Sequence, residues 1–209
     1  MLKIVLTGPE SCGKTTLARQ LATHFQIPLV EEFVREFFEK KETPQYQKAD
    51  LKEIAIGQLE AENKAIQALY QQMGTIKRLK TPLLVLCDTD VLTIKIWSEE
   101  KYKHCDDWII QQISDSKFQM SDSHLQNSKV IAPHEAIKPQ TIYLLCSPEG
   151  IAWETDTLRE NPNDRERLFE IYKQNLIFYQ KTYFILRGGI SERFDIAKGL
   201  IIENDSFNK

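Results

Sequence analysis

Gly8-Pro9-Glu10-Ser11-Cys12-Gly13-Lys14-Thr15 is the stretch that decides the fold of this 209-residue chain. It fits the pattern G-x-x-x-x-G-K-[ST], which is typical of loops that bind the phosphates of nucleoside triphosphates. An apolar run at residues 2–6 comes directly before it, and a helix-like run at residues 14–25 comes directly after it. A strand, a glycine-rich loop and a helix in this order place backbone N–H groups and a helix N-terminus around a polyphosphate. The stretch therefore predicts binding of a nucleoside triphosphate.

Each residue type in this loop has a chemical role. The two glycines permit backbone angles and a close approach to phosphate that a side chain would block. Lys14 is expected to reach the β- and γ-phosphates, and the hydroxyl of Thr15 is expected to bind Mg²⁺. The residues that we expect to bind ATP are Gly8, Glu10, Ser11, Cys12, Gly13, Lys14, Thr15 and Thr16.

Short apolar runs alternate with helical patterns along the rest of the chain. The runs that we interpret as strands cover residues 2–6, 27–30, 83–87, 141–146 and 183–186. This alternation predicts one α/β domain over residues 1–209, with a five-stranded parallel sheet flanked by helices. The size, the early second strand and the lack of further ATPase motifs favour a P-loop NTPase fold of the nucleoside/nucleotide kinase type. A polar segment at about 115–140 is expected to be an irregular excursion from this domain.

Asp88 follows the third apolar run directly. An acid at the end of a buried strand is the second signature of phosphate-loop enzymes, because its carboxylate lies beside the loop and helps to hold Mg²⁺. We therefore predict that Thr15 and Asp88 form the metal site. Asp90, two residues later, is expected to bind ribose hydroxyls, and the alternative is that it caps the helix that follows.

Glu31, Glu32 and Arg35 follow the second predicted strand. Because ligands in open α/β sheets bind outside the carboxyl ends of the strands, we expect these residues to bind the second substrate. The alternative is a solvated acidic helix start, where carboxylates favour the positive end of the helix dipole. A long helical pattern follows at residues 46–73, and Gly57 within it indicates either close backbone packing or a tolerated cost of about 1 kcal/mol relative to alanine.

Arg159, Arg165 and Arg167 gather after the fourth predicted strand. Small-molecule kinases carry a mobile lid at this place, and its arginines neutralise the charge of the transferring phosphate. We therefore predict a lid at residues 153–167, with Arg159 as its catalytic arginine. The alternative is a set of surface arginines on an amphipathic helix.

The composition bounds the choice of partners. The formal net charge is -3 and there is no long basic run, so the electrostatic footprint of a nucleic-acid-binding protein is missing. No apolar run approaches transmembrane length, and the N-terminus has no secretory pattern. The four cysteines form no C-x-x-C pair, which favours free thiols. We expect a cytoplasmic protein without nucleic-acid or membrane partners, and the sequence does not specify its oligomeric state.

Several motifs together resemble one family. These are the loop extended to Leu17, the segment Glu32-Phe33-Val34-Arg35-Glu36-Phe37, Ala55-Ile56-Gly57-Gln58, Asp88-Thr89-Asp90 and Asp156-Thr157-Leu158-Arg159. The chain resembles the ribosylnicotinamide kinase domain of NadR-type proteins, an AAA_28-like ATP-binding family whose loop typically reads G-x-E-S-x-G-K-[ST]. The likeness covers nearly the whole chain apart from the excursion.

The resemblance implies an ATP- and Mg²⁺-dependent kinase that phosphorylates the 5′-hydroxyl of nicotinamide riboside and yields the mononucleotide. In it, Glu32 would deprotonate the attacking hydroxyl, Arg35 would hold the acceptor or the γ-phosphate, and Lys14, Asp88 and Arg159 would complete the catalytic set. Relatives of this type tend to carry an aromatic residue, available to stack on nicotinamide, where this chain has Glu31. Two alternatives stay open: a kinase for another nucleoside-like acceptor, and a nucleotide-dependent switch with little turnover.

Overall fold

The computed structural model describes the chain except for residues 42–46, 76–82, 115–138, 156–158, 160–161 and 207–209. Its centre is a parallel sheet of five strands in the order β2-β3-β1-β4-β5. The strands are β1 (Leu2–Thr7), β2 (Leu29–Val30), β3 (Leu84–Asp88), β4 (Gln140–Cys146) and β5 (Thr182–Leu186). This confirms the α/β fold with a five-stranded parallel sheet.

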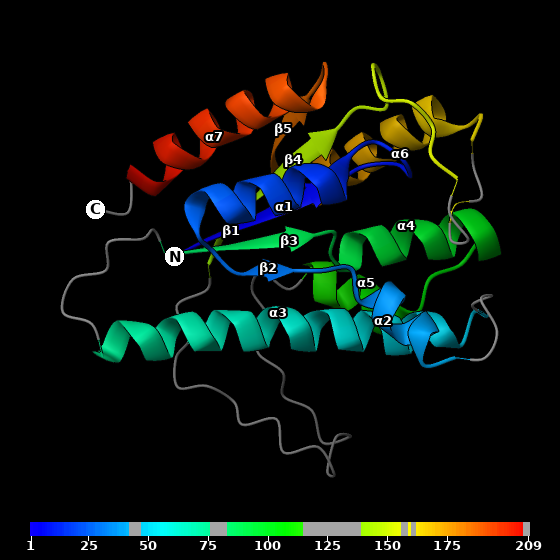
Figure 1. The fold of residues 1–209 in the computed structure, drawn as a ribbon. Coiled ribbons are helices and arrows are strands. Elements are labelled where there is room, and N and C mark those ends of the chain that lie inside the picture. Colours follow the sequence, from blue (N-terminus) through cyan, green and yellow to red (C-terminus); the bar gives the residue numbers. More distant parts are fainter. Residues whose placement is uncertain (42–46, 76–82, 115–138, 156–158, 160–161, 207–209) are drawn as a thin grey trace, which may run out of the picture.

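Helices cover both faces of the sheet (Figure 1). They are α1 (Lys14–Phe25), α2 (Phe33–Glu39), α3 (Asp50–Thr75), α4 (Val91–Tyr102), α5 (Asp107–Ser114), α6 (Arg165–Phe178) and α7 (Ile190–Ser206). One core cluster joins α1 and α7 to the sheet, and the other joins α3, α4 and α6 to its opposite face. None of the helices that the structure describes has both the length and the apolar character needed to cross a membrane.

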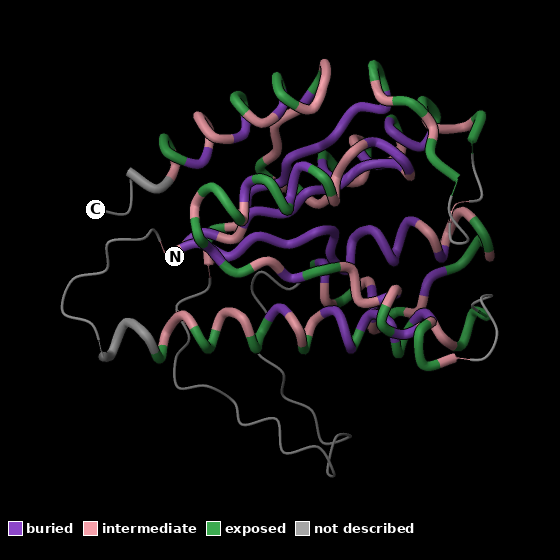
Figure 2. The backbone as a smooth tube through the Cα atoms, viewed as in Figure 1, coloured by how far each residue is buried: buried purple, intermediate pink, exposed green. Residues whose placement is uncertain are grey.

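The strand sequences explain this two-sided burial. In β1, Leu2, Ile4 and Leu6 enter the cluster beneath α1 and α7, whereas Val5 enters the cluster on the other face. Side chains alternate between the faces of a strand, so a strand covered on both faces must be apolar at successive positions. In Figure 2, β3 is buried along its whole length. Most of the apolar surface is therefore removed from water around the sheet.

The parallel register brings the functional segments to one edge. Leu6 pairs with Asp88, and Thr7 pairs with Leu145, so β1, β3 and β4 end side by side. Val30 at the end of β2 pairs with Cys87. The phosphate loop, the acids after β2 and β3, and the lid segment after β4 therefore start from neighbouring strand ends.

The structure differs from the expected elements in two places. β2 contains two residues, whereas the apolar run predicted a strand at residues 27–30. Pro28 lacks a backbone N–H and joins the ladder only as an acceptor, from Leu86 N. The long helix α3 begins at Asp50, whereas the pattern predicted a start at residue 46. The Asp50 carboxylate accepts a hydrogen bond of 2.6 Å from Gln47 N at this start. Most of the expected excursion, at residues 115–138, lies outside the described residues.

Candidate active site

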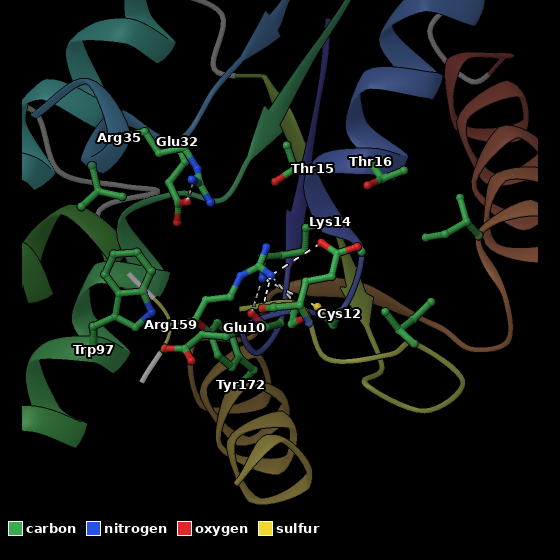
Figure 3. Close-up of a pocket in the computed structure, with 17 residues that line it drawn as sticks. Glu10, Cys12, Lys14, Thr15, Thr16, Glu32, Arg35, Trp97, Arg159 and Tyr172 are labelled. Carbon is green, nitrogen blue, oxygen red and sulfur yellow. Dashed lines mark hydrogen bonds and ion pairs between the residues drawn. The ribbon is translucent and has the colours of Figure 1, made fainter. Parts of the chain in front are cut away.

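A cavity of about 240 Å³ opens at the carboxyl edge of the sheet (Figure 3). Its walls come from the phosphate loop, the start of α2, helices α4 and α6, the lid segment and the start of α7. The lining residues are Gly8, Glu10, Ser11, Cys12, Gly13, Lys14, Thr15, Thr16, Glu32, Val34, Arg35, Trp97, Ile151, Glu154, Arg159, Tyr172 and Ile190. The cavity therefore contains every residue predicted to bind ATP, together with Glu32, Arg35 and Arg159.

The phosphate loop is held tightly against the end of β4. Gly8 has a φ of +134°, and a Cβ atom at this position would lie 2.6 Å from the carbonyl oxygen of Cys146. A residue with a side chain therefore does not fit there. The ammonium of Lys14 donates hydrogen bonds to the carbonyls of Gly8 (3.0 Å) and Pro9 (2.6 Å). Burial opposes its charge, but Cys12, Tyr172, Asp88 and Glu32 raise the pKa of Lys14, so it stays a cation.

Ser11 joins the phosphate loop to the lid segment. Its hydroxyl accepts a hydrogen bond from Glu154 N (2.8 Å) and contacts the carbonyl of Ala152 at 3.3 Å. Arg159 Nη1 lies 3.4 Å from the same hydroxyl and donates to the carbonyl of Glu154 at 2.5 Å. Ser11 is the serine of the family pattern G-x-E-S-x-G-K-[ST]. Through these contacts it holds the segment that carries Arg159, the predicted catalytic arginine.

The three lid arginines do not act alike. Arg165 donates hydrogen bonds to the carbonyls of Ser11 (3.0 Å) and Ile151 (2.9 Å), so it links the backbone of the phosphate loop to the segment after β4. Arg167 pairs with Glu100 and Asp164 outside this cavity, and half of its side chain is exposed. Of the three, Arg159 is the one that lines the cavity. The expected cluster of three arginines at the cavity is therefore reduced to one residue, and the catalytic role of Arg159 stays a prediction.

Thr15 and Asp88 meet as predicted. The Thr15 hydroxyl donates a hydrogen bond of 2.6 Å to Asp88 Oδ2. Asp88 Oδ1 is buried and has no hydrogen-bond partner among the described residues, which is unusual for a buried polar atom. Burial raises the pKa of this carboxyl, and Thr15 and Lys14 oppose the rise. An unpaired carboxylate oxygen beside a hydroxyl suits Mg²⁺, which prefers oxygen ligands.

A magnesium ion at this place would need ligands from outside the protein. Among the residues that the structure describes, no group of three or more His, Cys, Asp or Glu side chains is arranged to hold a metal. Mg²⁺ is usually bound by one or two protein groups together with waters and substrate phosphates. The Thr15–Asp88 pair therefore fits a metal that arrives with a nucleotide.

Asp90 does not face the cavity. Its Oδ1 accepts a hydrogen bond of 3.0 Å from Leu92 N, and its Oδ2 accepts one of 2.6 Å from the Tyr143 hydroxyl. The side chain is buried at 5% exposure. Thr89, between the two acids, has a left-handed φ of 71°, which allows Asp88 to face Thr15 while Asp90 caps α4. The helix-cap alternative is therefore what the structure shows, and the expected contact with ribose is not supported.

The acceptor-side residues separate into two groups. Glu32 and Arg35 line the cavity, with Arg35 Nε 3.6 Å from Glu32 Oε2, and the Glu32 side chain is 14% exposed. Glu31 instead forms an ion pair of 2.9 Å with Arg19, and both side chains are more than 60% exposed. The expected role of Glu31 in substrate binding is therefore not supported, because its carboxylate lies on the outer surface of the site.

Trp97 of α4 and Tyr172 of α6 also line the cavity, Tyr172 on the side of the phosphate loop, although sequence reasoning did not select them (Figure 3). Burial raises the pKa of the Tyr172 phenol, so it is neutral at physiological pH. Trp97 lies one helical turn after Thr93, whose hydroxyl contacts that of Thr7 at 3.5 Å. This spacing would have pointed to Trp97 only if the face of α4 that meets the loop had been known, and the sequence does not give that face.

Cys12 has an unusual environment within the loop. It lies against Cys146, and Lys14 Nζ is 3.7 Å from its sulfur. Burial opposes ionisation of the Cys12 thiol, but the hydrogen bond from Cys146 and the cations Lys14 and Arg193 lower its pKa to about 6. The pKa of Cys146 moves the other way, because its hydrogen bond to Cys12 and its burial disfavour a second thiolate. The surroundings of Cys12 in the phosphate loop therefore favour the negatively charged thiolate over the neutral thiol.

Solved structures share this fold. The crystal structure of NadR protein in complex with NR has 18% sequence identity and a TM-score of 0.66 over 97% of this chain. NadR in complex with NAD and AMP-PNP has 17% identity and a TM-score of 0.64. The chain covers 51% and 49% of these NadR chains, which is about half of their length. Thymidylate kinase from Ehrlichia chaffeensis has 14% identity and a TM-score of 0.53, with 95% of this chain and 98% of that chain covered.

The sequence has no match among curated proteins. The profile of the AAA_28 family, described as an AAA domain, matches residues 3–193. This match extends from β1 into α7 and includes every residue of the cavity. The chain therefore belongs to the AAA_28 family, on a fold shared with NadR and thymidylate kinase.

Proposed function

We propose that this protein is an ATP- and Mg²⁺-dependent kinase that phosphorylates the 5′-hydroxyl of nicotinamide riboside. One observation carries the proposal: a single cavity holds a complete phosphate loop and, opposite it, the acid–base pair Glu32–Arg35 beside the indole of Trp97. A nucleotide switch needs the loop alone, whereas a nucleoside kinase also needs a proton acceptor for the attacking hydroxyl and a surface that binds the ring of its acceptor. The fold shared with NadR in complex with NR supports the choice of acceptor.

On the donor side, the loop and Lys14 would hold the β- and γ-phosphates of ATP. Thr15 and Asp88 would hold Mg²⁺, which would neutralise negative charge on the phosphates. Arg159 reaches the loop from the lid segment, and its guanidinium would stabilise the negative charge that develops on the transferring phosphoryl group. Positioning and electrostatics of this kind supply most of the catalysis in phosphoryl transfer.

On the acceptor side, Glu32 would accept the proton of the 5′-hydroxyl as that oxygen attacks the γ-phosphorus and ADP departs. Arg35 would orient the carboxylate of Glu32 and hold the acceptor. Trp97 would supply the aromatic surface that the sequence lacks at position 31. The nicotinamide ring carries a positive charge, and an indole face with the carboxylates of Glu10 and Glu32 in the same cavity suits a cationic ring.

A kinase for another nucleoside or nucleotide is the second candidate. One observation favours it: the thymidylate kinase fold matches this chain over 98% of its own length, whereas the NadR chains match over half of theirs. The two candidates share the donor side and the roles of Lys14 and Asp88. They differ in the ring that contacts Trp97, which must be cationic only for nicotinamide riboside.

The decisive measurement is ADP formation from MgATP with nicotinamide riboside, thymidine, thymidylate, deoxyadenosine or no acceptor. We expect turnover with nicotinamide riboside and a product with the mass of its mononucleotide. Turnover with a different acceptor would select the second candidate. ADP formation that is independent of any acceptor, or absent with all of them, would contradict the assignment as a kinase of this class.

Glu32→Gln tests the proposed base. The change keeps the size of the side chain but removes the proton acceptor, so kcat should fall by roughly 10²–10⁴-fold while ATP affinity stays constant. Glu36→Gln is the matched control, because Glu36 is exposed on the same helix and pairs with Lys40. If transfer survives in Glu32→Gln at the wild-type rate, the base lies elsewhere.

A further inference from the structure

Arg193, on the first turn of α7, is a buried cation that the reaction described above does not use. Its side chain has 0% exposure and is the largest of the fully buried side chains. A guanidinium removed from water costs free energy unless hydrogen bonds and an opposite charge replace its hydration. A buried arginine therefore requires a physical reason, which its partners provide.

Its hydrogen bonds all go to backbone carbonyls. Nε donates to Gly188 O (2.7 Å), Nη1 to Cys12 O (2.8 Å) and Nη2 to Glu149 O (2.9 Å). Within the part of the chain that the structure describes, no carboxylate forms an ion pair with this guanidinium. Arg193 is thus well bonded, yet no carboxylate among the described residues balances its positive charge.

The three carbonyls belong to three different loops. Cys12 lies in the phosphate loop after β1, Glu149 in the loop after β4, and Gly188 in the loop after β5. β1, β4 and β5 are neighbours in the sheet. One side chain therefore links the carboxyl ends of three adjacent strands, at the edge where open α/β sheets bind their ligands.

The bond to Cys12 has a direct consequence for the phosphate loop. The described residues contain no cis peptide bond, so the Cys12 carbonyl and the Gly13 N–H point in opposite directions. Arg193 holds the carbonyl, which turns the Gly13 N–H away from α7, and Gly13 lines the cavity. A charge-assisted hydrogen bond to the carbonyl also polarises the peptide and makes its N–H a stronger donor.

The Cys12 thiol reports the same positive field. Burial opposes its ionisation, but the Cys146 thiol and the cations Lys14 and Arg193 lower its pKa to about 6. Arg193 therefore adds positive charge beside the loop in addition to holding its backbone. Phosphates bound in the loop would supply the negative charge that no described carboxylate provides.

We propose that Arg193 is a positioning residue for the triphosphate: it fixes the Cys12–Gly13 peptide from behind the loop, and bound phosphates neutralise its charge. This inference rests on the proposed function only in that ATP is the donor. It differs from a purely structural link between three loops, which would support the base, the ribose and the phosphates of the nucleotide equally.

The experiment compares the affinities of ATP, ADP and AMP in Arg193→Met and Arg193→Lys by isothermal titration calorimetry. Arg193→Met removes the charge, so ATP affinity should fall by at least about tenfold while AMP affinity falls by less than about twofold. Arg193→Lys keeps the charge but cannot span three carbonyls, so the loss for ATP should be smaller but still exceed that for AMP. Lys198→Met, on the same helix and more than a third exposed, is the control and should bind all three nucleotides as the wild type does.

The ratio of the ATP loss to the AMP loss decides the question. A ratio near one in either variant, or an unchanged ATP affinity, would overturn the proposal and leave Arg193 as a structural link. If Arg193→Met does not fold, as judged by circular dichroism, the same ratio in Arg193→Lys decides. Failure of the wild type to bind ATP would instead contradict the proposed function, so the two outcomes are distinguishable.

Discussion

The donor and acceptor sides of this cavity are built in different ways. The donor side comes from consecutive residues, Gly8 to Thr16, whose backbone geometry is set by the loop and by Arg193 behind it. The proposed acceptor side comes from Glu32 at the N-cap of α2, Arg35 on α2 and Trp97 on α4. The phosphate loop is thus encoded locally, whereas the proposed acceptor surface depends on how helices pack.

The supports of the two sides also differ. The donor loop is fixed by hydrogen bonds to its own backbone from Arg165 and Arg193. The start of α2 is fixed by α3: Phe33 N donates a hydrogen bond of 3.0 Å to Gln58 Oε1, and the Phe33 ring occupies the space beside Gly57. A change in α3 should therefore reach the acceptor side and leave the donor side intact.

Lys14→Ala should have a large effect on the donor side, because it removes the only side-chain cation that the loop motif itself supplies. We expect kcat/KM to fall by roughly 10²–10³-fold with every acceptor, as for other donors aimed at developing charge. Steady-state ADP formation measures this loss. Lys64→Ala, an exposed lysine of α3, is the control. A loss confined to one acceptor would break the distinction between a general donor side and a selective acceptor side.

Trp97→Ala should affect the acceptor side alone. Loss of an aromatic contact is worth about 0.5–1.5 kcal/mol, so KM for the acceptor should rise by roughly 2- to 12-fold while KM for ATP stays constant. Trp97→Phe should recover part of the affinity. Phe178→Ala, at 76% exposure on α6, should change neither constant. An equal rise in both KM values would place Trp97 in the donor site instead.

Gly57→Ala and Gly199→Ala should change stability in opposite directions. A Cβ at Gly57 would lie 2.1 Å from the Phe33 ring, whereas one at Gly199 would meet nothing within 4 Å. Overpacking costs about 1–3 kcal/mol, and replacing a helical glycine by alanine gains roughly 0.5–1 kcal/mol. Urea unfolding should show a net loss for Gly57→Ala and a gain for Gly199→Ala. Stabilisation of both variants would show that Phe33 moves without cost.

Cys12→Ser should have the smallest effect on activity, and its effect is visible in the pH dependence of stability. The Cys12 pKa is lowered from about 9 to about 6, so its ionisation stabilises the fold fully above pH 9, and this contribution is lost as the pH falls to 6. Between pH 6 and 8.5 the unfolding free energy of the wild type should rise with pH by at most about 1.4 kcal/mol per unit. The slope should be flatter in Cys12→Ser. Equal slopes would show that the loop does not favour the thiolate.

Much of the fold could be predicted from short-range patterns. Alternation of apolar strands with helical runs fixed the parallel sheet, because only buried strands stay apolar at successive positions. The boundaries were less certain at Pro28 and at Asp50, where a missing N–H and a carboxylate contact decided the limits. The two meanings left open for Gly57 were resolved by the Phe33 ring, a contact between α3 and α2.

The candidate site likewise contains residues whose positions could be predicted from the sequence and residues whose positions could not. The meeting of Thr15 with Asp88 was predicted because phosphate-loop enzymes carry an acid at the end of a strand beside the loop, and the pairing of β1 with β3 brings the two together. The position of Asp90 was not predicted in this way, because the left-handed backbone at Thr89 directs the Asp90 side chain towards Tyr143. Glu31 and Glu32 are neighbours in sequence, yet one pairs with Arg19 at the surface and the other lines the cavity.

By itself, the sequence determined that this chain forms a phosphate loop at a strand–helix junction, because glycine conformations, backbone N–H groups and a lysine act within eight residues. Only the tertiary structure decided which aromatic rings line the cavity and which buried arginine supports the loop. Trp97 lies 83 residues after Lys14, and Arg193 is 181 residues from Cys12. Contacts over such separations depend on sheet order and helix packing, which no local pattern specifies.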